Sequence, residues 1–361
     1  MQQSTTTKRI EWIDAMRGFT MILVVFSHVQ LFGIELPSSH NGINNLFIMF
    51  RMPLFFFVSG FIAYRVGEVW EWGHYRDSML KKMRVQLIPM LFFGLLYAVT
   101  VFAHKSGQTA GEALATFFNN KNKIGYWFTE VLLEMFVIYY TVSFLLRRRS
   151  LATRQWVLAV VAVGLFALSL ADSSTYNGHR VCRWLCLYKL LLYFQFFVMG
   201  NLLSCYRERV FRAMEGKFFM ATTILLFGVL YVTYRHLHGI EGGTLLMKGQ
   251  KLVAEGTRIA GVLIMVATFR HYERFFSKAT RVGRCLQYIG QRTLDVYLLH
   301  FYLLPTLPAL GLMLSRAGGV VVETTVVGVL SLLVIGFCLV ISNIIRVSPI
   351  LAYWLLGVKR K

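Results

Sequence analysis

The sequence predicts an all-α, polytopic integral membrane protein with about ten transmembrane helices and both termini in the cytoplasm. Three observations predict this fold class: an apolar composition, a series of long apolar runs, and a one-sided distribution of basic residues. Of the 361 residues, 56% are hydrophobic and 15% are charged, whereas about 25% of the residues in soluble domains are charged. The composition therefore excludes a water-soluble enzyme.

The apolar runs supply the expected helices in order along the chain. Most are close to the roughly 20 residues that a helix needs to cross a bilayer, and charged or turn-forming residues separate each run from the next. The runs occupy residues 15–34, 46–64, 86–103, 125–146, 155–171, 184–205, 218–234, 252–269, 286–314 and 320–345. Because little chain is left between them, we expect residues 1–361 to form a single transmembrane domain.

The basic residues fix the expected orientation of these helices. The net charge of +21 would suggest a nucleic-acid partner in a soluble chain. With the N-terminus placed inside, however, 25 Lys and Arg residues fall in cytoplasmic segments and 10 in external ones. Such a bias is the usual signature of membrane topology. We therefore expect membrane lipids, and no nucleic acid, around this protein.

Ionisable side chains inside apolar runs are costly in a bilayer and mark functional candidates. Arg17 and His28 lie eleven residues apart in the first run, which is about three helical turns and roughly 16 Å, so the two side chains share a face. That face presents an anion-binding guanidinium near the cytoplasmic surface and an imidazole deeper in the membrane. A histidine that only packs between helices is the structural alternative. Glu255 and Arg258, three residues apart, are expected to neutralise each other.

Four motifs in register resemble a known family. The stretch KRIEWIDAMRGFTMILVVFSHV contains Arg17 and His28, and NLFIMFRMPLFFFVSGFIAY follows it. The pair Trp127-Phe128 opens the fourth run, and LQYIGQRTLDVYLLH ends at His300. Together these motifs resemble membrane-bound acyltransferase family 3, in particular its branch of sugar O-acetylases.

The resemblance implies an activity, a donor and a location. Members of the family pass an acyl group, usually acetyl, from cytoplasmic acyl-CoA to a hydroxyl of an extracytoplasmic glycan or lipid-linked saccharide. This implies acetyl-CoA as the donor and the bacterial inner membrane as the location. The phosphates of CoA would be held by a basic mouth of Arg17, Lys81, Lys82 and Arg84. The family often has two arginines three apart in this region, and here those positions are Lys81 and Arg84.

His28 is the candidate general base, since an imidazole that titrates near neutral pH can take the proton of an attacking sugar hydroxyl. An acyl-histidine intermediate is the alternative. A carboxylate is expected to orient the imidazole, with Glu130, Glu134 and Asp14 as candidates. Asp14, three residues before Arg17, is more readily explained as a partner of Arg17 or a cap of the first helix.

Three further residues are candidates for substrate binding: Arg51, Trp127 and His300. Arg51 departs from the resemblance, because the sugar O-acetylase branch commonly has His before Met-Pro. It would contact an anionic acceptor, steady a developing oxyanion, or simply extend to the lipid headgroups. His300 would bind the acceptor or hydrogen-bond a helix backbone. Asp295 has no role that the sequence suggests.

One other class of function remains open at this level. A polytopic transporter for a small anionic or sugar-like solute would also use many helices and buried charges, although it has no stated need for the motif set. No His, Cys or carboxylate cluster has the spacing of metal ligands, so no metal is expected.

Overall fold

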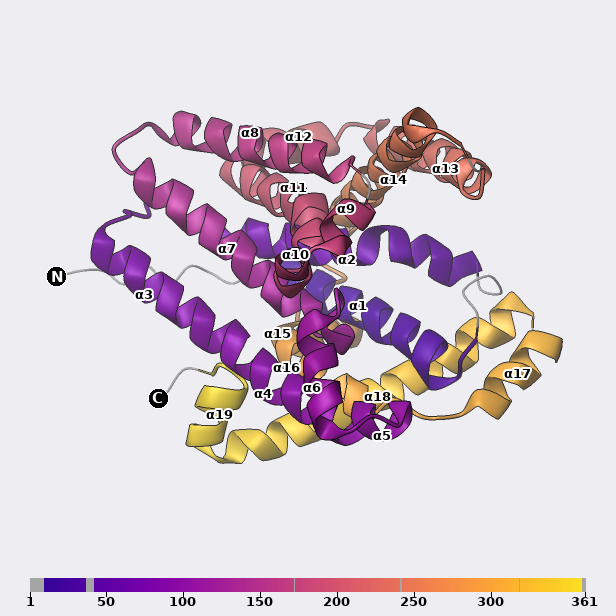
Figure 1. The fold of residues 1–361 in the computed structure, drawn as a ribbon. Coiled ribbons are helices and arrows are strands. Elements are labelled where there is room, and N and C mark those ends of the chain that lie inside the picture. The colour runs from indigo at the N-terminus through magenta and orange to yellow at the C-terminus, as the bar shows by residue number, and fades with distance from the viewer. Residues whose placement is uncertain (1–9, 37–41, 172, 241, 318, 359–361) are drawn as a thin grey trace.

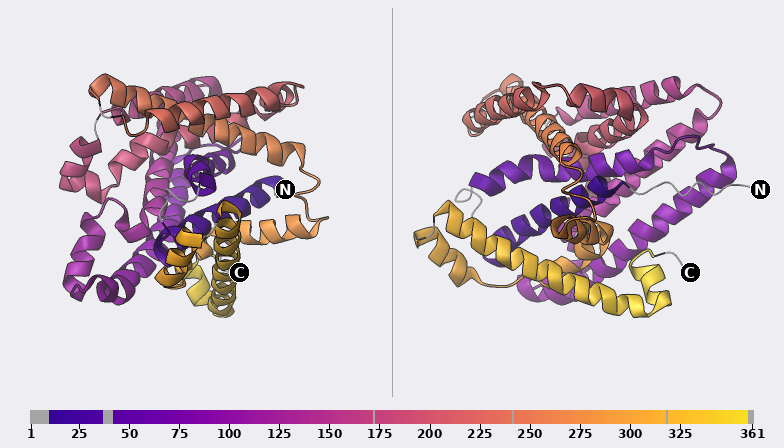
Figure 2. Two further views of the ribbon diagram at one scale, coloured as in Figure 1. Left: turned by 90° about the vertical axis from the view of Figure 1, so that its right-hand side faces the viewer. Right: turned by 180° about the vertical axis from the view of Figure 1, so that it is seen from behind.

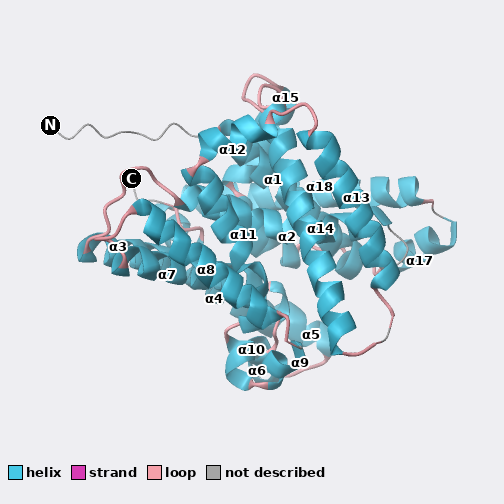
Figure 3. Ribbon diagram, turned by 90° about the horizontal axis from the view of Figure 1, so that it is seen from above, coloured by secondary structure: helices cyan, strands magenta, loops and turns pink. Residues whose placement is uncertain are grey.

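The computed structural model describes residues 10–36, 42–171, 173–240, 242–317 and 319–358, and within these ranges it is helical, with no strand. Figure 3 shows the helices packed into one bundle. The helices are α1 (Glu11–His28), α2 (Gly42–Ala63), α3 (Trp72–Lys82), α4 (Ile88–Tyr97), α5 (Ala103–Ser106), α6 (Ala110–Asn119), α7 (Trp127–Leu145), α8 (Leu151–Ser169), α9 (Ser173–Gly178), α10 (Arg180–Trp184), α11 (Leu187–Cys205), α12 (Arg207–Met214), α13 (Phe219–Leu237), α14 (Thr244–His271), α15 (Arg281–Gln291), α16 (Thr293–Leu299), α17 (Pro308–Ala317), α18 (Val320–Val347) and α19 (Pro349–Leu355).

Nine helices of the described chain are long and apolar enough to cross a membrane, which confirms the polytopic fold. The third of them is much longer than the predicted 86–103, because α3, α4 and α5 join through two π-helical turns into one helix, Trp72–Ser106. Large apolar side chains such as Leu225, Val232 and Phe337 are more than half exposed on the flanks. An apolar surface of this kind requires lipid around it.

The predicted helix over 286–314 is not continuous. The chain forms α15, changes direction at Arg292, continues as α16 and ends in a short 3₁₀ turn, His300–Tyr302. Residues 303–307 are not helical, and α17 follows. The prolines explain this second interruption, because Pro305 and Pro308 lack the N–H that a continuing helix needs. The break positions the end of α16 beside α1.

Two close helix pairs form the centre of the bundle. A Cβ atom on Gly18 of α1 would lie 1.9 Å from the carbonyl oxygen of Leu286, and one on Gly290 of α15 would lie 1.8 Å from that of Asp14. Gly60 of α2 and Gly200 of α11 are related in the same way. Glycine therefore lets the backbones touch, as small residues do in membrane bundles.

The α15–α16 segment runs in the same direction as α1. At one end the backbone N–H of Lys278, just before α15, donates to Glu11, and at the other His300 contacts His28. In Figure 1, α3, the α7–α8 turn and α19 lie on the left, and α17 lies on the right. We call the left side, which carries Arg65 and Arg147–Arg149, the basic end. Figure 2 shows α18 running along the flank between the two sides. The two chain termini themselves lie outside the described residues.

Candidate active site

A pair of histidines forms the centre of the site. Nδ1 of His28, at the end of α1, lies 2.8 Å from Nε2 of His300, and the two rings are nearly parallel. His300 is fully buried, and its Nδ1 lies 2.8 Å and 3.1 Å from the carbonyl oxygens of Tyr297 and Val296.

These contacts assign the tautomers of both rings. Carbonyl oxygens only accept, so Nδ1 of His300 carries the proton and its Nε2 is an acceptor. Nδ1 of His28 then donates to that acceptor, which leaves the lone pair on Nε2 of His28. A neutral imidazole with a free Nε2 lone pair is the form that a general base requires.

In this structure the hydrogen-bond partner of Nδ1 of His28 is an imidazole, and not one of the carboxylates that the sequence suggested. Glu130 lies 3.9 Å from Lys123 and 3.6 Å from the thiol of Cys186. Both oxygens of Glu134 are buried and make no hydrogen bond to the described residues. Neither glutamate lines the cavities around His28. Asp14 contacts Arg17 at 3.8 Å, as the alternative interpretation predicted.

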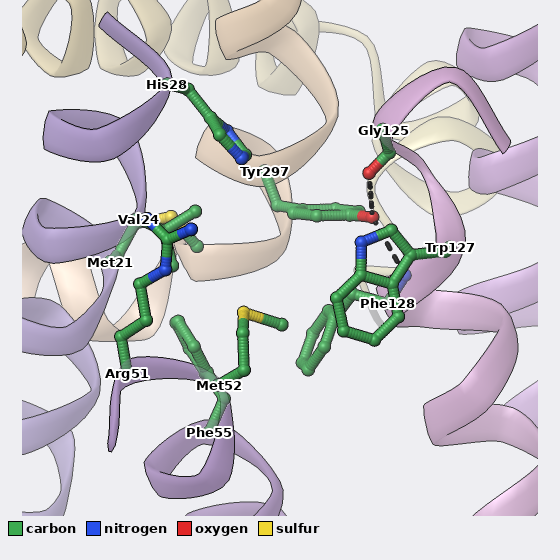
Figure 4. A pocket seen from close by; sticks show the side chains of 10 residues that line it. All are labelled: Met21, Val24, His28, Arg51, Met52, Phe55, Gly125, Trp127, Phe128 and Tyr297. Atoms are coloured by element: carbon green, nitrogen blue, oxygen red, sulfur yellow. Dashed lines mark hydrogen bonds between the residues drawn. The ribbon is translucent and has the colours of Figure 1, made fainter. Parts of the chain in front are cut away.

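His28 lies where two cavities meet. The first, the reaction cavity, has a volume of about 60 Å³ and is lined by Met21, Val24, His28, Arg51, Met52, Phe55, Gly125, Trp127, Phe128 and Tyr297. Figure 4 shows these side chains converging from α1, α2, the start of α7 and α16. The second, the outer cavity, has a volume of about 780 Å³ and shares His28, Gly125 and Trp127 with the first.

The wall between them is a strained turn before α7. Lys123, Ile124 and Gly125 all have positive φ angles, which is rare outside glycine. At Gly125 a Cβ would lie 2.2 Å from the ring of Phe301, so only glycine fits. The carbonyl of Gly125 accepts a hydrogen bond from the Tyr297 hydroxyl at 2.9 Å, as drawn in Figure 4. The turn thereby fixes Trp127, a predicted substrate residue, at the edge of both cavities.

A third cavity, of about 240 Å³, continues from the reaction cavity toward the basic end, and we call it the inner cavity. It shares Met21, Phe55, Phe128 and Tyr297 with the reaction cavity and is lined by Arg17 and Lys82. Arg17 also donates to Thr293 at 2.9 Å, across the break between α15 and α16. A fourth cavity, of about 140 Å³, shares Lys82 with the inner cavity and adds Lys81 and Arg65. We call it the basic vestibule.

The structure brings together three of the four cations predicted to hold CoA. Arg17, Lys81 and Lys82 line this connected space, but Arg84 does not. Its guanidinium donates to the carbonyl of Tyr353 at 2.9 Å and stacks on the Tyr353 ring. The π-helical turn Met83–Leu87 explains the difference, because a wider turn changes the rotation per residue and aims Arg84 at α19. In this structure Arg84 therefore packs against α19 and, unlike the other three predicted cations, does not line the inner cavity or the basic vestibule.

Two other ionisable groups turn out to be structural. Asp295, for which the sequence suggested no role, accepts hydrogen bonds from Ser342 at 2.5 Å and from Arg346 at 2.5 Å. It therefore ties α16 to α18. Arg258 contacts Glu255 at 2.8 Å, which confirms the predicted neutral pair.

Sequence reasoning named His300 but missed its contact with His28. It also missed Tyr297 as the residue that anchors the Gly125 turn. The quoted motif LQYIGQRTLDVYLLH contains both, so the signal was present. Their meeting with α1 and with the turn before α7 depends on contacts between residues more than 160 positions apart.

Helices of membrane-spanning length that surround the His28–His300 pair and the adjoining cavities define a polytopic membrane protein. The acyltransferase domain of acyltransferase family 3 matches residues 10–343, nearly the whole described chain. The chain belongs to this family and is a membrane acyltransferase. Searches of curated proteins and of solved structures return no significant match. The family assignment gives no support to the transporter alternative.

Proposed function

We propose that this protein transfers an acetyl group from cytoplasmic acetyl-CoA to a hydroxyl of an extracytoplasmic glycan or lipid-linked saccharide, with His28 as general base. The observation that carries the proposal is the position of His28, which lines both the reaction cavity and the outer cavity. A base at that point can serve a donor that enters from the basic end and an acceptor that enters from the other.

The basic vestibule and the inner cavity suit the donor. CoA carries phosphate groups, and Lys81, Lys82 and Arg65 supply positive charge at the entrance, with Arg17 further inside. Beyond Arg17 the inner cavity is lined largely by apolar and aromatic residues such as Leu132 and Phe136. Such a lining suits the long, weakly polar pantetheine arm, which would bring the thioester to His28.

The outer cavity suits a saccharide. It is lined by aromatic rings, including Phe32, Tyr97 and Trp127, and by polar side chains, including Asn120 and Asn122. Carbohydrate rings have apolar faces and hydroxyl edges, so they need both kinds of contact. The inner membrane of a bacterium, with acceptors on its outer side, fits the proposal.

The reaction follows from the tautomer assigned above. Nε2 of His28 takes the proton of the acceptor hydroxyl, and the hydroxyl oxygen attacks the thioester carbonyl. The tetrahedral intermediate then collapses, the carbon–sulfur bond breaks, and the CoA thiolate takes the proton from His28. The products are an acetyl ester and CoA. His300 holds the imidazole in place and stabilises the positive charge that forms on it.

The test uses the purified full chain in lipid nanodiscs with radiolabelled acetyl-CoA and a pool of bacterial envelope glycans. We expect acetyl transfer by the wild type and a loss of at least about 10²-fold in the His28→Ala variant, because general base catalysis supplies that much. His236→Ala, which removes an exposed histidine at the end of α13, is the matched control and should keep full activity. Undiminished transfer by His28→Ala would contradict the role of His28.

A further inference from the structure

Arg51 lines the reaction cavity, and two of the three nitrogens of its guanidinium are buried. Arg51 lies on α2, and the described residues offer no hydrogen-bond acceptor to its Nε or Nη1, although both atoms are buried. Figure 4 shows the side chain pointing into the space below His28, which is the reaction cavity. The alternative that Arg51 extends to lipid headgroups is therefore wrong.

In the part of the chain that the structure describes, no carboxylate forms an ion pair with this cation. None of the ten residues that line the reaction cavity is Asp or Glu. On α14, which packs against α2, the carboxylate of Glu255 is already engaged by Arg258 at 2.8 Å and by Gln195 at 2.6 Å. A buried, unpaired cation is costly. A negative charge that arises in the cavity during the reaction cycle would offset this cost.

The size of the cavity identifies that charge. At about 60 Å³ it is the smallest of the four cavities described above. A cavity of this size suits a small reacting group, such as a thioester carbonyl and the oxygen that attacks it, better than a whole sugar ring. Arg51 does not line the outer cavity, where the body of the acceptor would lie. The reacting carbonyl is therefore a better partner for the Arg51 guanidinium than an anionic group elsewhere on the acceptor.

We propose that Arg51 is a catalytic residue whose guanidinium N–H groups stabilise the oxyanion that forms on the thioester carbonyl. The inference rests on the proposed acetyl transfer. When the acceptor hydroxyl attacks and its proton moves to Nε2 of His28, the carbonyl π electrons move onto oxygen. Arg51 donates to that oxygen until the carbon–sulfur bond breaks and the carbonyl re-forms. A donor fixed in place before the reaction stabilises the transition state more than the substrate.

The test compares Arg51→Met and Arg51→Lys with the wild type in nanodiscs. It measures kcat, the KM for the acceptor and the equilibrium binding of acetyl-CoA. We expect Arg51→Met to lower kcat by about 10²- to 10³-fold, which is typical for the loss of one oxyanion donor. Acetyl-CoA binding and the acceptor KM should change by less than about threefold, and Arg51→Lys should be intermediate. Arg235→Met, which removes an exposed cation of α13, is the control.

A second donor keeps the test informative if Arg51→Met does not fold. Fluoroacetyl-CoA has a more electrophilic carbonyl and needs less oxyanion stabilisation, so the loss in Arg51→Lys should be smaller with it than with acetyl-CoA. A raised acceptor KM with unchanged kcat would overturn the proposal in favour of acceptor binding. Unchanged kinetics in both variants would overturn it while the proposed function stands. Failure of the wild type to transfer acetyl would overturn both.

Discussion

The hydrogen bonds of His300 determine what His28 can do. An imidazole without fixed hydrogen-bond partners can carry its proton on either ring nitrogen, whereas the carbonyls of Val296 and Tyr297 fix the proton of His300 on Nδ1. Because His300 then offers only an acceptor to His28, the lone pair of His28 points away from it. A histidine here performs the orienting task that a carboxylate performs in many hydrolases.

The residue-scale prediction concerns this contact. Replacing His300 with Phe keeps a ring but removes the hydrogen-bond acceptor of His28. We expect kcat to fall by about 10²-fold, which is the lower end of the rate enhancement that a general base typically supplies. Replacing His300 with Gln supplies an amide oxygen that can accept from His28, so it should retain more activity than Phe. Steady-state kinetics of both variants, with acetyl-CoA binding as the control for folding, check this. Equal losses in the two variants would show that His300 only fills space.

At the scale of elements, the π-helical turn Met83–Leu87 and the break at Arg292 determine what the nearby cations contact. The turn lies within the long helix Trp72–Ser106 and sends neighbouring basic residues to different places: Lys82 faces two cavities, and Arg84 contacts α19. The break lets Thr293 accept a hydrogen bond from Arg17. Irregular helix geometry of this kind is frequent at functional sites.

The element-scale prediction separates Lys82 from Arg84. Lys82→Ala should weaken acetyl-CoA binding by about tenfold, since losing one charge-assisted contact costs about 1.5 kcal/mol or more. Arg84→Ala should leave the affinity within about twofold and instead lower the thermal stability, because it removes the contact with Tyr353. Isothermal titration calorimetry and thermal unfolding of both variants check this. A larger affinity loss in Arg84→Ala than in Lys82→Ala would return Arg84 to the donor site.

At the scale of the whole molecule, the cavities form one connected series from Lys81 at the basic end to Lys105 and Glu35 in the outer cavity. The smallest of the four by volume is the reaction cavity, which both His28 and Arg51 line. With a larger cavity on each side of this small one, two large substrates would meet only through their reacting atoms. The positive-inside bias then predicts which substrate enters from which side.

The prediction at this scale is sided transfer in sealed vesicles. In proteoliposomes with the basic end outward, external acetyl-CoA should acetylate an acceptor enclosed in the lumen, and CoA should appear outside. Proteoliposomes of the opposite orientation should need acetyl-CoA inside. Measuring labelled ester and free thiol in each compartment checks this, with detergent-opened vesicles as the control. Transfer only when both substrates share a compartment would contradict the path through the bundle.

The sequence by itself determined the class of the fold and half of the site. Apolar runs can be read directly from the order of residues, because a helix that crosses a membrane needs a long apolar stretch. Nine of the ten predicted helices are present in the described chain. The shared face of Arg17 and His28 follows from helix periodicity alone. Pro305 and Pro308 indicate that a helix over 286–314 is interrupted. The prediction of one continuous helix relied instead on the apolar composition of the whole run.

Only the tertiary structure decided which groups meet. His28 meets His300, which is 272 residues away in the sequence. Arg84 contacts α19 because a π-helical turn redirects it. The surroundings of Arg51, whose Nε and Nη1 have no hydrogen-bond partner among the described residues, likewise depend on how the helices pack. Local periodicity says which way a side chain points on its own helix. It cannot say which helix lies opposite, because close packing at glycines such as Gly18 and Gly290 sets those distances.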